Sequence, residues 1–515
     1  MGTKTSDAPA QHGEPVFTSD VVKLLIGGKW VDASTGRTFP SYNPATGELM
    51  ANLAEGGPDD VDRAVAAAKK AFKTWRLLPA PKRGEILFRA AALLVERKEH
   101  LARLMTMEMG KVLAEARGDV QEAIDMTFYM AGEGRRLAGT VVPSELPNKW
   151  AMAVRDPIGV VGAITPWNFP IAIPSWKMIP ALVAGNTVVF KPASDTPLCA
   201  IEFIKILVEA GIPDGVLNVV YGPGSTVGAA MINNPDIALI SFTGSTLAGN
   251  QVAVEGARTL KRVSLEMGGK NAIIVMDDAN LSLAVEGILW SAFGTTGQRC
   301  TAASRVIVHR AVQKKLEEML EERVKKLRLG NGLEPTTDVG PVINRAQLQN
   351  IHDMVERGRK EGSKILCGGE IATENGLDRG SFYRPTLFTD VPGDAYVAQE
   401  EIFGPVTTLI PVSSLDEAID VNNHTKYGLS SSIYTADVNV AFRAMRDITT
   451  GIVYINAGTI GAEIQLPFGG TRGTGNGHRE AGQAGLDVFT EWKTVYVDYS
   501  GKLQRAQIDT LDPAV

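Results

Sequence analysis

The sequence predicts an α/β protein built on a doubly wound parallel sheet, and two stretches of alternating strands and helices carry this prediction. Short runs rich in Val and Ile recur in the middle of the chain, at 160–164, 187–190, 216–220 and 238–242. Helix-like stretches lie between them, and one of these, 197–210, ends at Gly211. Such alternation is typical of βαβ units, whose parallel strands need a right-handed crossover. A similar alternation from 272 to about 434 predicts a second α/β domain.

Local signals predict the elements on either side of this region. A Gly-Gly pair predicts a short strand and turn at 23–30. The start signal at 57–60 precedes apolar residues spaced by three and four, which predict one face of a helix: Val61, Val65, Ala68, Phe72 and Trp75. Two more helices are expected, one from Pro81 past Leu104 and one from about 112 to 137. A final, partly exposed strand is expected at 491–499, followed by an irregular segment.

Composition excludes several classes of protein. A chain of 515 residues has room for two to four domains, and its formal net charge of −6 argues against a nucleic-acid partner. No run approaches the roughly 18 apolar residues of a membrane span, and the polar residues 1–20 do not resemble a signal peptide. Three cysteines are too few to crosslink the chain, which favours a reducing compartment, the cytoplasm, and one reactive thiol: Cys199, Cys300 or Cys367.

Two motifs have the residues of a nucleophile and a base. Cys300 lies in a Gly/Thr-rich turn beside Arg299, and a neighbouring cation favours the thiolate. A lone cysteine more often serves packing, so Cys300 needs support from other residues. Glu266 stands between Leu265 and a Gly pair. An isolated acid is usually solvated, but a desolvated one has a raised pKa that suits a general base.

Other motifs are weaker. The glycines at 222–228 have the spacing GxGxxxG, one residue off the dinucleotide fingerprint, and fit a plain strand-to-helix turn as well. The segment 242–245 (FTGS) ends a predicted strand and opens a helix, where backbone N–H groups can hold a phosphate. The aromatic turn at 167–170 offers an amide or simply core packing. The six histidines lack ligand spacing, so no metal site is expected, and His478 is expected at the surface or behind the site.

Seven motifs in order resemble the NAD(P)-dependent aldehyde dehydrogenase superfamily, from about Leu24 to Tyr499. They are 165–170 (TPWNFP), 191–194 (KPAS), 242–245 (FTGS), 265–269 (LEMGG), 297–300 (GQRC), 400–405 (EEIFGP) and 467–470 (PFGG). The resemblance implies a Rossmann-like cofactor domain, an α/β catalytic domain and a small β oligomerisation flap that forms dimers or tetramers. The expected ranges are 1–22 for a leader, 23–138 with 158–267 for the cofactor domain, 268–483 for the catalytic domain, 139–157 with 484–500 for the flap, and 501–515 for a tail.

The resemblance also implies the chemistry. Cys300 matches the nucleophile that forms a thiohemiacetal and then a thioester after hydride transfer to NAD or NADP. Asn168, with the Cys300 backbone N–H, matches the oxyanion hole, and Glu266 matches the base that activates water. Lys177 belongs to the same catalytic set. A nucleophile, an oxyanion stabiliser and a base that act at different moments form a consistent mechanism.

For the cofactor, Lys191 matches a ribose ligand, Gly224 an adenine contact, Ser245 a pyrophosphate contact, Glu401 the nicotinamide-ribose ligand and Phe403 a neighbour of the nicotinamide. The implied site also includes Ile164, Thr165, Trp167, Ser194 and Gly244. Many NAD-preferring members have Glu where Ser194 stands. Without that carboxylate a 2′-phosphate meets no repulsion, so we expect NADP to be accepted.

The implied substrate is an aldehyde, with Phe169, Trp176 and Phe468 as an apolar wall. Arg299 and Thr301 flank the nucleophile, and Arg299 either anchors a carboxylate or points away and fixes the loop. Motifs at 143–145, 299–301 and 461–463 are similar to aminoadipate-semialdehyde dehydrogenases. In that comparison Glu122 falls near the position of an acid that contacts the substrate in that subfamily. Motifs at 165–167 and 191–194 look more like ketoglutarate- or succinate-semialdehyde members. A charged semialdehyde is therefore the hypothesis.

Two other functions compete with hydrolytic oxidation. A CoA-acylating relative would keep Cys300 but release the acyl group to a thiol, and the presence of Glu266 favours water. A non-catalytic binding or structural protein on the same fold would not need Cys300, Glu266 and Asn168 together. The tail after residue 500 has spaced apolar residues, and we hypothesise that it crosses an oligomer interface.

Overall fold

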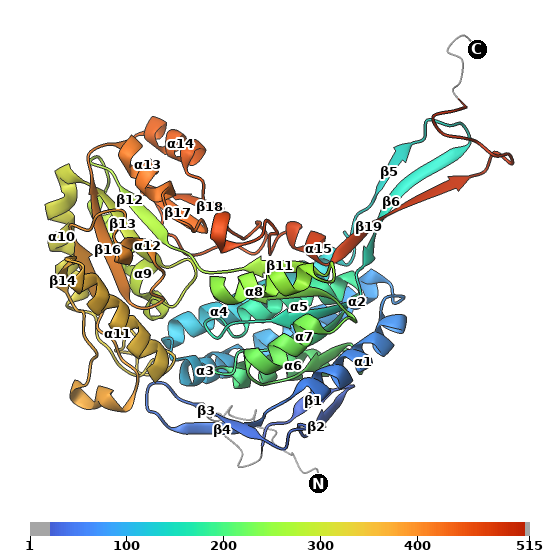
Figure 1. The fold of residues 1–515 in the computed structure, drawn as a ribbon, viewed down its shortest axis with the longest axis horizontal. Coiled ribbons are helices and arrows are strands. Elements are labelled where there is room, and N and C mark those ends of the chain that lie inside the picture. The colour runs from blue at the N-terminus through green and yellow to red at the C-terminus, as the bar shows by residue number, and fades with distance from the viewer. Residues whose placement is uncertain (1–20, 510–515) are drawn as a thin grey trace, which may run out of the picture.

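Two seven-stranded sheets form the two lobes of the molecule, and a third, narrow sheet projects away from them (Figure 1). The structure is a computed structural model that describes residues 21–509. All but two residues of the expected leader, and residues 510–515 of the expected tail, lie outside this range. Both lobes have the predicted α/β architecture with mainly parallel sheets.

The first sheet contains the four strands predicted in the middle of the chain. β7 to β11 run parallel, whereas β1 and β2 join one edge in the antiparallel direction. Every residue of β7 and β8 is buried, as a parallel strand covered on both faces requires. In sheet order the strands are β11 (Arg262–Glu266), β10 (Ile237–Thr243), β7 (Val160–Ile164), β8 (Thr187–Lys191), β9 (Leu217–Val219), β1 (Leu24–Ile26) and β2 (Lys29–Val31).

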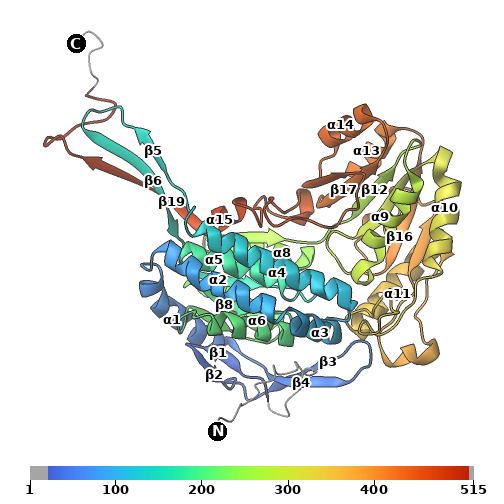
Figure 2. The ribbon, with the colours of Figure 1, turned by 180° about the vertical axis from the view of Figure 1, so that it is seen from behind.

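Helices cover this sheet in two groups. One group comprises α1 (Pro58–Trp75), α7 (Ala229–Asn233) and α8 (Thr246–Ala257), which contact the strands and one another. In the other group, α5 contacts β7 and β8, and α2, α3 and α4 are in front when the molecule is seen from behind (Figure 2). Its members are α2 (Ala80–Glu96), α3 (Lys98–Met109), α4 (Leu113–Glu133), α5 (Ala172–Ala184) and α6 (Pro197–Glu209).

The single helix expected from Pro81 past Leu104 is wrong, because α2 ends and α3 begins at Arg97. Arg97 has φ −101° and ψ 7°, outside the helical region. Arg97 and Lys98 are ordinary helix formers that give no stop signal in the sequence. Both halves contact α4 and α6, so tertiary packing rather than local propensity decides where the helix breaks.

The second sheet confirms the alternation expected from 272 to about 434 and adds a strand beyond it. Six strands are parallel and β14 is antiparallel. Side chains alternate between the two faces: Ile273 and Val275 of β12 join one apolar cluster, and Ala272 and Ile274 join the other. In sheet order the strands are β14 (Lys364–Cys367), β15 (Thr386–Thr389), β16 (Val406–Val412), β13 (Ala303–His309), β12 (Asn271–Val275), β17 (Ser430–Tyr434) and β18 (Ile452–Ile455).

Helices also cover both faces of this sheet. α9 and α10 contact each other and the same strands, and α13 contacts α14 and the central strands. The helices of this lobe are α9 (Leu281–Phe293), α10 (Arg310–Val324), α11 (Arg345–Lys360), α12 (Tyr396–Gln399), α13 (Leu415–Asn423) and α14 (Val438–Asp447). A small hairpin of β3 (Thr38–Tyr42) and β4 (Leu49–Ala54) lies beside the first lobe (Figure 1).

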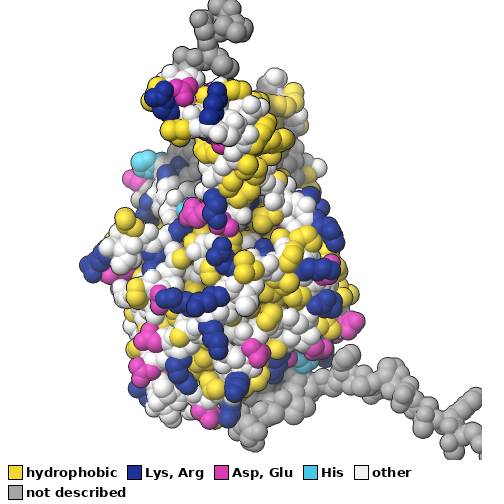
Figure 3. Space-filling model, turned by 90° about the vertical axis from the view of Figure 1, so that its right-hand side faces the viewer, with side chains coloured by type: hydrophobic (Ala, Val, Ile, Leu, Met, Phe, Trp, Pro, Cys, Tyr) yellow, Lys and Arg dark blue, Asp and Glu magenta, His cyan; other side chains and the backbone are white. Residues whose placement is uncertain are grey.

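The third sheet, here called the arm, consists of β5 (Thr140–Pro143), β6 (Lys149–Pro157) and β19 (Thr490–Asp498). α15 (Ala484–Val488) directly precedes β19. β19 confirms the last strand expected at 491–499. Hydrophobic side chains gather along the arm (Figure 3), and its exposed apolar residues include Val141, Val142, Trp150, Trp492, Tyr496 and Val497. Beyond β19 the chain folds back on the arm's tip, where Gln504 Nε2 donates to Pro147 O at 2.8 Å.

No helix among residues 21–509 is long and apolar enough to cross a bilayer. The exact boundaries of the cofactor domain, catalytic domain and flap remain predictions from the resemblance.

Candidate active site

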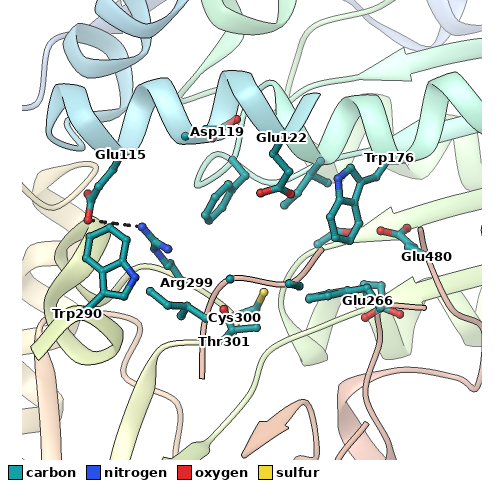
Figure 4. Close-up of a pocket in the computed structure, with 18 of the residues that line it drawn as sticks. Glu115, Asp119, Glu122, Trp176, Glu266, Trp290, Arg299, Cys300, Thr301 and Glu480 are labelled. Atoms are coloured by element: carbon teal, nitrogen blue, oxygen red, sulfur yellow. Dashed lines mark ion pairs between the residues drawn. The ribbon is translucent and has the colours of Figure 1, made fainter. Parts of the chain in front are cut away.

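A cavity of about 260 Å³ lies beside Cys300, between α4, α5, the segment 460–468 and the loop 294–300, here called the cysteine loop. Figure 4 shows Glu115, Asp119 and Glu122 along one helix on one side of the cavity, with Cys300 and Arg299 opposite. The structure brings Cys300 and Glu266 to this cavity. It also places there all six side chains expected to contact the substrate: Phe169, Trp176, Arg299, Thr301, Phe468 and Glu122.

The cysteine loop follows α9 and has an uncommon backbone. Thr295 and Thr296 both lie in the left-handed region, with φ 52° and 57°. This conformation is rare for β-branched residues and costs of the order of 1–3 kcal/mol for each. At Gly297 (φ 67°) an added Cβ would lie 2.1 Å from Gly404 O. The loop therefore depends on contacts with the surrounding structure to keep its shape.

Two asparagines hold the backbone near Cys300. Asn168, which follows β7 and is buried, donates from Nδ2 to Gln298 O at 3.0 Å. Asn271, at the start of β12, donates from Nδ2 to Cys300 O at 2.7 Å and to Ala302 O at 2.9 Å. The amide expected in the oxyanion hole thus lies against the cysteine loop, with its donor directed at the loop's backbone.

The expected activation of Cys300 by its neighbouring cation is wrong. Burial, with the nearby carboxylates of Glu401 and Glu266, raises the pKa of the Cys300 thiol to about 12. Arg299 Nη2 instead pairs with Glu115 at 3.5 Å. The thiol is therefore protonated at neutral pH, and a base must accept its proton during attack.

Glu266 has the desolvated setting that the sequence suggested. It ends β11, its side chain is buried, and neither carboxyl oxygen has a hydrogen-bond partner among the described residues. Burial, reinforced by the charge of Glu480, raises its pKa well above the usual range. At Gly469 (φ 147°) a Cβ would stand 2.6 Å from Glu266 Oε1, so glycine leaves room for this carboxyl group.

Lys177 and Glu480 form a buried ion pair between α5 and the loop before α15. Lys177 Nζ also lies 3.2 Å from Ser241 Oγ. Glu480 lines the cavity and its charge acts on Glu266. A chain of ionisable groups therefore runs from the cavity through Glu266 and Glu480 to Lys177.

Arg299 borders the cavity and also contacts the cysteine loop, while its binding of a substrate carboxylate stays a prediction. Its Nε donates to Thr295 Oγ1 at 2.9 Å. The guanidinium lies over the rings of Phe169 and Trp290, 5.5 Å and 5.1 Å from their centroids. Glu122 faces the same cavity, and burial, with the charge of Asp119, raises its pKa to about 8.

The residues expected to bind the cofactor gather at the carboxyl edge of the first sheet. β7 ends at Ile164 next to Thr165, β8 ends at Lys191, and Ser245 caps α8 by accepting the Ala248 N–H at 3.3 Å. Ligands of doubly wound sheets bind at this edge. Gly244 stands between β10 and Ser245.

The surroundings of these residues leave room for a ligand. Lys191 Nζ donates to Pro192 O at 3.0 Å, and burial lowers its pKa to about 8, so it is mainly cationic at neutral pH. Ser194 Oγ donates to Gly222 O at 3.3 Å. No atom lies within 4 Å of a Cβ added at Gly224, so its backbone is open to a partner.

Trp167, which follows β7, meets Phe403 of the second lobe edge to face, with ring centroids 5.4 Å apart. Glu401 Oε1 accepts the N–H of Gly269 at 2.9 Å. A Cβ at Gly268 would lie 1.9 Å from Glu401 Oε2, so the glycine pair seats this carboxylate. Burial raises the pKa of Glu401 to about 7.

The sequence of the chain was compared with models of known protein families. The model of the aldehyde dehydrogenase family matches residues 30–495. The chain belongs to the aldehyde dehydrogenase family. The expected fold and enzyme class are thereby confirmed, since the match spans both lobes and most of the arm.

Relatives of this aldehyde dehydrogenase include enzymes named for semialdehydes. It is 43% identical to the α-ketoglutarate semialdehyde dehydrogenase of Haloferax volcanii, over 93% of this chain and all of that one. It is 40% identical to the NADP(+) succinate-semialdehyde dehydrogenase of Escherichia coli, over 92% and 96%. A crystal structure of Staphylococcus aureus betaine aldehyde dehydrogenase with NAD+ has TM-score 0.91 at 34% identity, covering 93% of this chain and 96% of that one.

Three acids that line the cavity of this aldehyde dehydrogenase, Glu480, Glu115 and Asp119, are not among the residues predicted from the sequence. Glu480 follows His478 by two residues, is only 4% exposed and pairs with Lys177. Glu115 lies in a predicted helix, yet it contacts the cysteine loop 180 residues away. A buried partner so distant in sequence leaves no local signal, and an acid on the buried side of α4 is no hint, because Asp119 and Glu133 are buried there too.

Proposed function

We propose that this aldehyde dehydrogenase oxidises a carboxylate-bearing semialdehyde to the dicarboxylic acid, with NAD+ or NADP+ as oxidant and water as the acyl acceptor. The observation that carries the proposal is one cavity lined by Cys300, Glu266 and the cationic Arg299. The names of the Haloferax and Escherichia relatives support the substrate class.

In the proposed first step, Cys300 Sγ attacks the aldehyde carbon and its proton passes to a base. This step need not use Glu266, because the carboxyl groups of Glu122 and Glu480 line the same cavity. The new oxyanion is stabilised by the Asn168 amide and the Cys300 backbone N–H. Donors held in place before reaction can contribute several kcal/mol of transition-state stabilisation, roughly 3–4 for one donor.

Once the thiohemiacetal carbon has lost its hydride to the oxidised cofactor, Cys300 carries a thioester. Glu266 then removes a proton from water, which attacks the thioester and releases the acid and the free thiol. The raised pKa of Glu266 makes it a strong enough base for this task. The charges of Glu480 and Lys177 act on Glu266 and so influence its readiness to accept the proton. A CoA-acylating enzyme would need no such base, so the isolation of Glu266 favours hydrolysis.

The cofactor would lie along the carboxyl edge of the first sheet. Lys191 would bind a ribose, the open backbone at Gly224 the adenine side, and Ser245 the pyrophosphate. Glu401, seated by its glycine pair, would bind the second ribose, with Phe403 beside the ring. When bound, the nicotinamide supplies the acceptor for the hydride of the thiohemiacetal carbon.

Replacing Ser194 by Glu should lower the ratio of kcat/KM for NADP to that for NAD by at least about tenfold, because a carboxylate there would repel the 2′-phosphate. Steady-state kinetics with both cofactors measure this ratio. Ser282→Glu, at an exposed position of α9, adds the same charge far from the site and should leave the ratio unchanged. An unchanged ratio in Ser194→Glu would contradict the proposed basis of NADP acceptance.

Arg299→Gln should lower kcat/KM for succinate semialdehyde about 30-fold more than for butanal, since a charge-assisted hydrogen bond to a carboxylate contributes roughly 1.5–3 kcal/mol. The two substrates have the same number of carbons, so butanal reports any effect of the variant on the cysteine loop alone. An aldehyde panel with NAD and NADP in parallel tests the whole proposal. Equal losses for both substrates would exclude Arg299 as the carboxylate ligand.

We also propose that the arm pairs with a second copy of the chain, giving a homodimer or homotetramer. Its apolar side chains are exposed on a sheet too thin to bury them itself. The cytoplasm is the proposed location, supported by the three free cysteines.

A further inference from the structure

Glu115 lies in the first turn of α4, is buried, and directs its carboxylate at the cysteine loop. Both oxygens, Oε1 and Oε2, accept the Thr295 N–H at 2.9 Å, and Oε2 also accepts the Thr295 hydroxyl at 3.3 Å. Arg299 Nη2 approaches Oε1 at 3.5 Å (Figure 4). One carboxylate thus contacts the loop at two residues, Thr295 in the left-handed turn and Arg299 after it.

The loop needs such support because Thr295 and Thr296 adopt a conformation that β-branched residues disfavour. Other contacts hold its later part: Thr296 Oγ1 donates to Gly340 O at 3.0 Å, and Gln298 Oε1 accepts the Ile343 N–H at 3.0 Å. At Thr295 the backbone N–H turns to Glu115 alone among the described residues. Because Arg299 and Cys300 follow four and five residues later in the same loop, the conformation of Thr295 contributes to where both side chains face the cavity.

We propose that Glu115 is a positioning residue that holds Thr295 in the left-handed conformation, and thereby places the Cys300 thiol and orients the Arg299 guanidinium. Glu115 contacts the Arg299 guanidinium directly. It also accepts a hydrogen bond from Thr295 Oγ1, which in turn accepts one from Arg299 Nε. The part concerning Arg299 and a substrate carboxylate rests on the proposed function. The part concerning Cys300 does not.

The test is a double-mutant cycle between Glu115→Ala and Thr295→Gly, read with butanal, which carries no carboxylate. A misplacement of about 1 Å can cost about 100-fold in rate, and we expect kcat of Glu115→Ala to fall by that order. Glycine adopts the left-handed conformation without steric cost. Glu115→Ala should therefore cost at least about tenfold less in the Thr295→Gly background than in the wild type.

Alkylation of Cys300 by iodoacetamide gives a second reading that needs neither cofactor nor turnover. Its rate constant should change in Glu115→Ala and return toward that of the Thr295→Gly parent in the double variant. Glu133→Ala is the matched control: Glu133 is a buried, ion-paired glutamate at the other end of α4, and its loss should leave both readings unchanged in the folded enzyme. If Glu115→Ala does not fold, Glu115→Gln keeps the size and one acceptor and enters the same cycle.

Equal losses in the two backgrounds, or a fully active Glu115 variant, would overturn the proposal. Failure of the proposed function has a different signature. In that case succinate semialdehyde and butanal would respond alike to Arg299→Gln, while the cycle at Glu115 and Thr295 would still show its coupling with butanal.

Discussion

Replacing Glu266 by Gln is expected to abolish steady-state turnover while a burst of reduced cofactor remains. Gln keeps the size of the side chain but cannot remove a proton from water, so the thioester forms and is not hydrolysed. Loss of a general base typically costs about 10²–10⁴-fold, and the burst should approach the order of one equivalent per active site. Stopped-flow absorbance of the reduced cofactor separates the burst from the steady rate.

The pH dependence of the same step provides a check on the wild type. Burial raises the pKa of Glu266, so the carboxylate that acts as base becomes populated as the pH rises. When thioester hydrolysis limits turnover, kcat should therefore increase with pH, at pH values above those at which an ordinary glutamate ionises. A Glu266→Gln enzyme that turns over normally, or one that shows neither burst nor turnover, would place the base elsewhere or give Glu266 a role in the first step.

Cys300→Ala is expected to remove aldehyde oxidation altogether, by at least about 10⁴-fold, because no other group can form the covalent intermediate. Binding of NAD+ or NADP+, followed by protein fluorescence, should persist, since the expected cofactor residues lie on the first sheet and the 401–403 segment. Loss of cofactor binding together with activity would indicate a folding defect instead of loss of the nucleophile.

The other two cysteines serve as controls for Cys300. Cys199 is fully buried in α6, and burial raises the pKa of its thiol well above the usual range. Cys367, in β14, is only partly buried and lies outside the cavity wall. Cys199→Ala and Cys367→Ala should both retain kcat, and Cys199→Ala should lose some stability. A comparable loss of activity in either variant would contradict the assignment of the nucleophile.

Much of the site could be predicted because its residues lie in short local motifs. Asn168 follows β7 and Glu266 ends β11, so the fold class alone brings these two residues to the same edge of the first sheet. Cys300 lies between α9 and β13, and its own motif rather than the fold class identifies it. Phe169 and Trp176 follow Asn168 closely in the chain and line the cavity beside Cys300. Their proximity needed no long-range information.

What escaped prediction depends on pairs that are far apart in sequence. Lys177 forms an ion pair with Glu480, 303 residues later in the chain. No local sequence pattern around either residue predicts this pairing. The sequence predicts that the charge of Arg299 stabilises the Cys300 thiolate. In the structure the guanidinium instead pairs with Glu115 and donates a hydrogen bond to Thr295. The break of the helix at Arg97 has the same origin, because packing on α4 and α6 decides it.

β5 and β19 are the edge strands of the arm, since each has a neighbouring strand on one side only within residues 21–509. An exposed edge strand is a template for unwanted pairing with another chain, and natural proteins seldom leave one uncovered. An engineer who sought a monomeric version would therefore face two separate tasks. Charged residues would have to replace Trp150 and Tyr496 on the faces, and prolines or charges would have to blunt the outer strands. Shortening the tail alone would leave the apolar faces and edge strands of the arm exposed, and the protein would be prone to aggregation.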